Sequence, residues 1–416
     1  MHRTLGPLAH PDFRWLTLGA TISRAGTALT VVALAFAVLD LGGSASDLGL
    51  VVGAYALTEV ITTLLGGVLG DRVPRQVMLE GASVASALGH AVIAASLLGG
   101  WASLPLLAVL GMANGVFSAL GGPSSQAMTP LTVPAAELSR AIAVRRISAN
   151  LATIGGFSLA GLLVAWWGAG AVIALDAASY LLAALCFWRL RVPQVLPEQH
   201  TSMLSDLTVG LREVRRHAWL WLLIGQALLY HLFFGGAQGV LGPIVVGDDF
   251  GREAWGWALA ALMGGFVVGG LLTLRWRPRH ALFVGTVCLS LTACFPLAMA
   301  WSPTVAGVLV GAFLHGLGLE IFSVWWDTSI QQQIPPETLA RVYSLDMVGS
   351  FVMRPVGLAL TGPVAELVGL RTWLVVIGLV IGVSSLLTCL VPDVRNLVRR
   401  EEGAEPERGA AEPITA

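Results

Sequence analysis

Twelve long apolar runs dominate the 416-residue chain. A helix that crosses the hydrocarbon core of a bilayer needs about 20 mostly apolar residues, and each run reaches that length. Only 12% of the residues are charged, about half the share that covers the surface of a water-soluble domain. The sequence therefore predicts an all-α integral membrane protein with twelve transmembrane helices. The expected spans are residues 16–40, 48–70, 77–98, 102–124, 141–168, 170–190, 218–246, 254–274, 281–300, 303–326, 342–369 and 371–391.

The arginines predict how these helices are oriented. All 24 basic residues are arginine. If the N-terminus is cytoplasmic, 20 of them fall in cytoplasmic segments and two, Arg252 and Arg371, in external loops. This asymmetry is the one the positive-inside rule requires. We therefore expect a multi-pass protein of a bacterial inner (plasma) membrane with both termini in the cytoplasm; the lysine-free, alanine- and glycine-rich composition indicates the bacterial source.

An internal repeat relates the two halves of the chain. A shift of 201 residues superposes Gly156 on Gly357, Gly161 on Gly362 and Gly168 on Gly369. Parallel six-helix repeats are the plan of one large class of secondary transporters. We therefore predict two pseudo-symmetric six-helix bundles.

The predicted organisation has four parts, namely residues 1–190 as the first bundle, 191–217 as a cytoplasmic linker, 218–391 as the second bundle and 392–416 as a disordered cytoplasmic tail. Within the linker, apolar residues recur at helical spacing opposite arginines. This pattern is typical of an amphipathic helix that lies on the membrane surface.

The loop after the second span carries Gly67, Asp71, Arg72 and Arg75. It resembles the G-x-x-x-D-R-x-x-R motif of the major facilitator superfamily. The segments 175–180 and 206–217 are similar to those of the branch that contains the enterobactin exporter and the macrolide efflux pumps. The resemblance covers residues 8–392.

This resemblance implies the superfamily fold and alternating-access export of a small hydrophobic molecule, such as a drug, an antibiotic or a siderophore, by proton antiport. It also implies that Gly67, Asp71, Arg72 and Arg75 form a conformational gate between helices 2 and 11. Alternatively, Arg72 and Arg75 only fix the topology. The implied partners are a small-molecule substrate, protons and the lipid bilayer, and a monomer is expected.

Five ionisable residues lie inside predicted spans, namely Arg24, Glu59, Asp176, Glu320 and Arg354. Such a residue near the bilayer centre costs roughly 2.5–3.5 kcal/mol on insertion scales, so it faces a partner or a cavity. Depth along the helices predicts the pairs Arg24–Glu59 and Glu320–Arg354. These pairs are either static, or one carboxylate exchanges its proton for substrate, with Glu320 the first candidate and Glu59 the second. Asp176 is assigned a structural role.

Three further polar residues, Asn114, His231 and His315, occupy spans that the resemblance places around the central cavity. Each is interpreted either as part of the substrate and proton pathway or as a packed, hydrogen-bonded residue. His90, on the third span, is expected to face lipid or the core.

Other function classes are excluded by what the sequence lacks. Without lysine there is no phosphate-binding G-x-x-x-x-G-K-[ST] loop, so ATP-driven transport by this chain is excluded. The four cysteines have no metal-type spacing, and the net charge of −1 gives no sign of a nucleic-acid partner. No cofactor, metal or enzymatic activity is expected. The remaining alternatives are a proton-linked importer or facilitator of a small organic solute, and a non-transporting membrane sensor.

Overall fold

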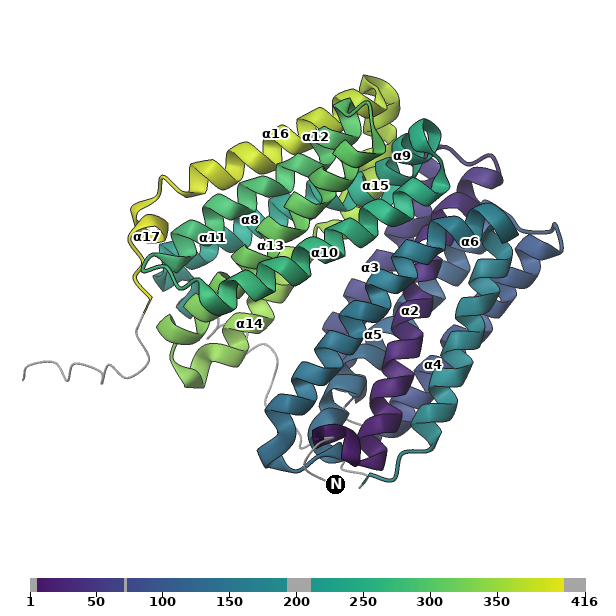
Figure 1. The fold of residues 1–416 in the computed structure, drawn as a ribbon, viewed down its shortest axis with the longest axis horizontal. Helices are drawn as coiled ribbons and strands as arrows, with labels where there is room; N and C mark the ends of the chain where they lie inside the picture. Colours follow the sequence, from purple (N-terminus) through teal and green to yellow (C-terminus); the bar gives the residue numbers. More distant parts are fainter. Residues whose placement is uncertain (1–5, 71–72, 193–210, 400–416) are drawn as a thin grey trace, which may run out of the picture.

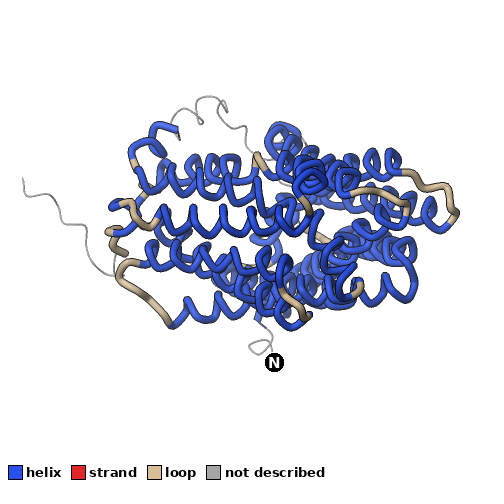
Figure 2. The backbone as a smooth tube through the Cα atoms, turned by 90° about the horizontal axis from the view of Figure 1, so that it is seen from above, coloured by secondary structure: helices blue, strands red, loops and turns tan. Residues whose placement is uncertain are grey.

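The computed structural model describes residues 6–70, 73–192 and 211–399, and within these ranges it contains helices and connecting loops but no strand (Figure 2). The first half has the helices η1 (Gly6–Ala9), α2 (Pro11–Asp40), α3 (Ala45–Gly70), α4 (Arg75–Leu98), α5 (Leu104–Thr132), η2 (Ala135–Glu137) and α6 (Leu138–Trp188). The second half has α8 (Ala218–Gly236), η3 (Ala237–Leu241), α9 (Gly242–Phe250), α10 (Arg252–Arg275), α11 (Ala281–Leu289), η4 (Ser290–Ala293), α12 (Cys294–Trp301), α13 (Val305–Gln333), α14 (Pro336–Phe351), α15 (Arg354–Val368), α16 (Leu370–Thr388) and α17 (Pro392–Arg395).

The predicted transmembrane helices are confirmed. Eleven helical stretches of the described chain are long and apolar enough to cross a membrane. The longest includes all 51 residues of α6, which as a straight helix would measure about 76 Å. Gly168, with φ 78° and ψ 162°, breaks it into two helices, and this conformation suits glycine because it has no Cβ. The two parts supply the fifth and sixth spans.

Three spans of the second half are interrupted where the sequence places a proline. Pro243 follows the π-helical turn η3, Pro296 follows the 3-10 turn η4, and Pro355 follows the break between α14 and α15. Proline has no N–H to donate to the carbonyl four residues earlier. The eleventh span is therefore two helices rather than the single helix expected over 342–369, and Arg354 begins the second of them.

The internal repeat is visible in equivalent close contacts inside each half. A Cβ on Gly156 would lie 2.6 Å from the carbonyl oxygen of Ala25 on α2, and one on Gly357 would lie 3.0 Å from Cα of Leu232 on α8. Both glycines let the backbones of two helices approach more closely than any side chain allows. The fifth and first spans thus cross as the eleventh and seventh do, which confirms the predicted pseudo-symmetry.

The same repeat joins the two halves to each other. A Cβ on Gly161 of α6 would lie 2.6 Å from Cα of Glu253 at the start of α10, and one on Gly362 of α15 would lie 2.5 Å from Cα of Ser46 at the start of α3. Figure 1 shows the two bundles meeting at this end, where α3, α9 and α15 come together, and diverging toward the end that carries the N-terminus. We call these the joined end and the divergent end.

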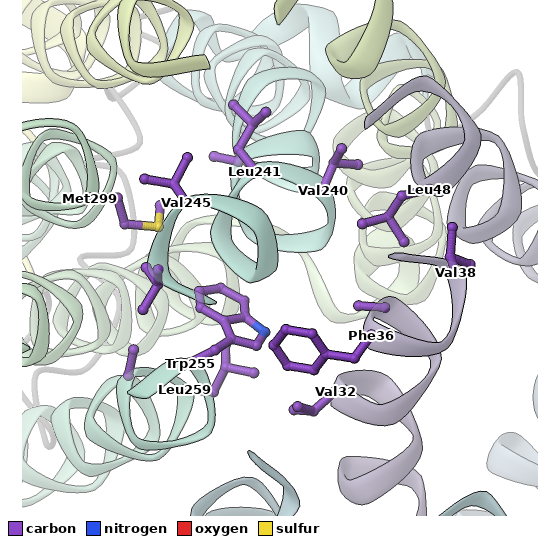
Figure 3. Close-up of a cluster of buried hydrophobic side chains, with 14 of the residues drawn as sticks. Val32, Phe36, Val38, Leu48, Val240, Leu241, Val245, Trp255, Leu259 and Met299 are labelled. Carbon is purple, nitrogen blue, oxygen red and sulfur yellow. The ribbon is translucent and has the colours of Figure 1, made fainter. Parts of the chain in front are cut away.

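The largest buried apolar cluster also lies at the joined end and contains side chains from both halves. Phe36 and Leu48 of the first half face Val240 and Trp255 of the second half (Figure 3). Apolar burial therefore holds the halves together at one end. The described ends of the chain, η1 and α17, both lie toward the divergent end (Figure 1), as an even number of crossings requires.

Most of the predicted amphipathic linker helix, and the predicted tail beyond residue 399, lie outside the described residues. The last turn of that linker helix, residues 211–216, is helical. Val214 is buried there against Trp219 and Leu220 of α8, whereas Arg212 and Arg215 are exposed. Leu211, which the pattern places on the same side as Val214, is exposed, and Glu213 is buried. The described turn therefore has the predicted apolar contact at Val214 only.

Candidate functional site

The first predicted ion pair, Arg24–Glu59, does not form. Arg24 on α2 is exposed, and no carboxylate of the described chain lies within ion-pair distance of it. Glu59 on α3 is half-buried and accepts a hydrogen bond from Ser118 Oγ of α5 at 3.3 Å. Both residues lie within predicted spans, but their side chains do not form an ion pair.

The second predicted pair, Glu320–Arg354, is also wrong. Glu320 lies half-buried on α13, beside Gly269 and Gly270 of α10. The charge of Arg146, on α6 of the other half, acts on both Glu320 and Asp327. Glu320 therefore faces a cation across the divergence between the halves and not one in its own half.

Arg354 instead belongs to a polar group at mid-depth, which we call the central cluster, made of Tyr55, Glu59, His231 and Arg354. Arg354 packs its stem against Gly235, one turn beyond His231 on α8, and its charge acts on His231 and on Tyr55 of α3. Tyr55 also experiences the charge of Glu59, one turn along the same helix. The structure thus brings together three of the predicted site residues, contributed by both halves.

His315 has a local structural explanation. It is fully buried on α13, and its Nδ1 donates to the carbonyl oxygen of Thr292 at 2.7 Å. That carbonyl lies four residues before Pro296 and so has no helical partner. The Tyr230 hydroxyl, 2.7 Å from Nε2, donates to the remaining ring nitrogen. The neutral ring satisfies every group that it contacts.

Asn114 lies within the first half and not between the halves. It is 3% exposed, and neither its amide nitrogen nor its oxygen has a hydrogen-bond partner in the described structure. A Cβ on Gly89 of α4 would lie 2.8 Å from Asn114 Oδ1. Asn114 therefore faces the α4–α5 contact. His231 donates Nδ1–H to the carbonyl of Ala227 at 2.8 Å, and it forms a second hydrogen bond with the backbone of Ser350.

The predicted gate lies partly outside the described residues. Asp71 and Arg72 fall in the undescribed loop, and Gly67 lies in the last turns of α3. Arg75 begins α4, and its Nη1 donates to the carbonyl oxygen of Ala127 on α5 at 3.5 Å. The latch to helix 11 therefore stays a prediction.

A different set of polar contacts joins the halves at the joined end. Arg252 forms a two-pronged ion pair with Asp40, with Nη1 donating to Oδ2 at 2.9 Å and Nη2 donating to Oδ1. Glu366 accepts a hydrogen bond from the backbone N–H of Ser46 at 3.0 Å. From the sequence, Arg252 is expected only to be an external charge. Its position at the start of one span, with Asp40 at the end of another, is the signal that indicates this pair.

A buried polar group inside the first half was not predicted from the sequence. We call it the His90 cluster, and it consists of Thr27, Thr30, His90, Asp176 and Tyr180. Asp176 is fully buried, and its Oδ2 accepts a hydrogen bond from Thr30 at 2.6 Å and lies 3.7 Å from His90 Nε2. The His90 ring stacks on Tyr180 with 5.4 Å between centroids and 8° between planes. Its members come from three spans, so no local pattern could join them.

The protein has two pseudo-symmetric six-helix halves that meet at one end, and charged side chains of the central cluster lie between them. This architecture defines a secondary transporter of the parallel-repeat class. A family model described as the Major Facilitator Superfamily matches residues 16–358. The chain belongs to this superfamily. The resemblance seen in the sequence is thereby confirmed, and the protein is a multi-pass membrane transport protein and not an enzyme.

The chain is also similar to individual proteins over nearly its whole length. It is 26% identical to the multidrug efflux pump Tap of Mycobacterium tuberculosis, covering 92% of this chain and 94% of that protein. It is 22% identical to macrolide efflux protein A of Streptococcus pyogenes, covering 92% and 97%. A solved structure of a POT family transporter in complex with 5-aminolevulinic acid superposes with a TM-score of 0.73 at 13% identity, covering 92% and 97%. The last likeness is one of fold alone.

Proposed function

We propose that the protein exports small, largely apolar molecules from the bacterial cytoplasm by proton antiport and alternating access. The observation that carries the proposal is the placement of the central cluster between two halves that are joined at one end and diverge at the other. The full-length similarity to two efflux pumps supports export over import. In this proposal the divergent end faces the cytoplasm, and residues 1–190 and 218–391 are the two moving bodies.

The geometry suggests how the cycle proceeds. Contacts at the joined end are close glycine crossings, an exposed ion pair and apolar packing, and rocking of the halves would separate them. At the same time Arg146 would approach Glu320 and Asp327, whose charges already interact with it across the halves. This approach would stabilise the opposite state, because an ion pair strengthens as water leaves.

The proton in this scheme is carried by a carboxylate between the halves. Glu320 is the first candidate, because Arg146 favours its charged form in the state where the halves approach, whereas a proton would neutralise it when they diverge. Glu59 is the second candidate, because it lies in the central cluster with only one described hydrogen bond.

The test uses the full-length protein in liposomes, with ethidium and erythromycin as probes. Accumulation driven by a pH gradient supports antiport, and Glu320→Gln should abolish it. Asp248→Asn, which removes an exposed carboxylate near the joined end, is the matched control. Flux of equal size with and without the gradient would refute antiport in favour of a facilitator, and no flux of either probe or of organic solutes would favour a sensor.

A further inference from the structure

We propose that His90 and Asp176 form a proton-binding pair inside the first half, separate from the charges between the halves, which takes up and releases one proton during the transport cycle. This inference rests on the proposed function as an antiporter. It gives that antiporter a second proton site, away from the path of the substrate.

The hydrogen bonds of His90 fix how the pair holds its proton. Nδ1 lies 2.9 Å from the carbonyl oxygen of Ser86, and a carbonyl only accepts, so Nδ1 carries a hydrogen. Nε2 then faces Asp176 Oδ2 and, in a neutral imidazole, presents a lone pair to it. A lone pair and a carboxylate repel, and a proton on Nε2 or on the carboxyl group relieves this repulsion. The pair in this state holds one proton and has no net charge.

Loss of that proton leaves a buried carboxylate that retains two hydrogen-bond donors. Asp176 Oδ2 keeps the bond from Thr30 at 2.6 Å, and Oδ1 keeps the bond from Ser179 Oγ at 2.9 Å. A buried carboxylate with hydrogen bonds is tolerated far better than one without them. Both the protonated and the deprotonated pair are therefore states that the fold can hold, and the move between them transfers only a proton.

The pseudo-symmetric position in the second half shows that packing does not require the pair. The 201-residue shift that superposes Gly168 on Gly369 places Asp176 at Ile377 and Tyr180 at Ile381. Both isoleucines are fully buried. An apolar residue of similar volume at the site of a buried ion pair is often neutral or stabilising. The first half thus has an ionisable pair at a position where the second half has buried isoleucine side chains.

A polar stripe on α2 connects the pair to the exposed residue Arg24. Arg24, Thr27 and Thr30 recur three residues apart, so they lie along one side of the helix. Their exposure falls along this stripe, because Arg24 is exposed, Thr27 is half-buried and Thr30 is buried. Thr27 Oγ1 accepts a hydrogen bond from the Tyr180 hydroxyl at 3.0 Å, and Tyr180 covers the His90 ring. This stripe is the exchange route that we assign to the proton.

The charged and titratable groups around the pair come from each neighbouring helix. From α2 the group is Arg24, whose charge acts on Tyr180, and from α3 it is Tyr55, which interacts with Asp176 and itself experiences Glu59. Helix α5 has no ionisable side chain. Substrate or proton binding at the central cluster would therefore change the field at the pair through Tyr55.

The first experiment separates proton coupling from transport itself. Full-length protein in liposomes is assayed for ethidium accumulation under a pH gradient and for ethidium counterflow without one. A one-unit gradient supports about tenfold accumulation for one-for-one exchange. We expect Asp176→Asn and His90→Gln to lose this accumulation and to keep wild-type counterflow, because exchange needs no net proton transfer. His10→Gln is the matched control, since it removes a histidine–carboxylate pair at the surface, 3.5 Å from Glu137.

The second experiment reads the proton directly and needs no substrate. Infrared spectra of the purified protein should contain a protonated-carboxyl band that titrates, that Asp176→Asn removes and that His90→Gln shifts. Gradient-driven accumulation that survives in both variants would overturn the inference, as would a band that neither variant changes. A wild type without any gradient effect would refute antiport, and the infrared titration would then decide whether the pair binds a proton. If Asp176→Asn fails to insert, His90→Gln carries both experiments.

Discussion

Replacing Gly161 by alanine should shift the protein away from the state in which the joined end is closed. Gly161 lies on α6 where it crosses the start of α10, and a Cβ there would lie 2.6 Å from Cα of Glu253, with the carbonyl oxygen of Arg252 closer still. Ordinary contacts are 3.4 Å or longer. Because the opposing atoms are backbone, no side-chain rotation can relieve the clash. The two helices must separate by nearly an ångström.

The size of the shift follows from the difference between the two states. Overpacking a close contact costs about 1–3 kcal/mol, and the cost falls only on the state in which the halves touch here. The gain in helix propensity from glycine to alanine, about 0.5–1 kcal/mol, applies to both states and cancels. The equilibrium should therefore move about 5- to 150-fold away from the closed joined end.

Pulsed EPR measures this shift directly. Spin labels at Ser103→Cys and Leu367→Cys report across the joined end from exposed positions on opposite halves, after the four native cysteines have been replaced. Gly161→Ala should increase the population with a long label separation. Gly155→Ala is the control on the same helix, because a Cβ there meets nothing within 4 Å. Equal distance distributions for the two variants would refute the reasoning.

Three further predictions concern side chains. Asp40→Asn should shift the same EPR distribution by a smaller amount, since exposed ion pairs contribute about 0.2–1 kcal/mol, and the exchange Asp40→Arg with Arg252→Asp should restore it. His315→Leu should lower the free energy of unfolding in detergent by about 1–3 kcal/mol for each buried group left unpaired, of which the Thr292 carbonyl is one; unchanged thermal melting would contradict its structural role. Glu320→Gln should remove pH-gradient-driven transport but not membrane insertion, and retained gradient-driven transport would disprove its role as the coupling acid.

The spans and the repeat could be predicted because both are local properties of the sequence. Length and apolarity decide whether a segment crosses a bilayer. The same 201-residue shift that relates Gly156 to Gly357 relates Gly161 to Gly362, and these glycines mark the same helix crossings in each half. The break before Pro355 was equally readable, since proline removes a helical hydrogen bond. The single helix expected over 342–369 does not take this effect of Pro355 into account.

The ion pairs could not be predicted in the same way, because depth is one coordinate of three. Arg24 and Glu59 lie at similar depth, yet pairing also depends on the rotation of each helix about its axis and on which helices are neighbours. Both are set by packing between distant segments. The same limit hid the contact between His90 and Asp176, which come from spans 86 positions apart in the sequence.

The contacts that hold the joined end together are of two kinds. Deep apolar burial alone would trap one state, because fully burying a single large side chain is worth about 1.5–3 kcal/mol. The apolar cluster around Phe36 and Trp255 is one kind. The other kind consists of the backbone crossings at Gly161 and Gly362, which have no side chains to unpack, and of the half-exposed Asp40–Arg252 pair. The crossings and the ion pair fix the register of the two halves at a modest energetic cost of separation, whereas the apolar cluster supplies most of the energy that holds this end closed.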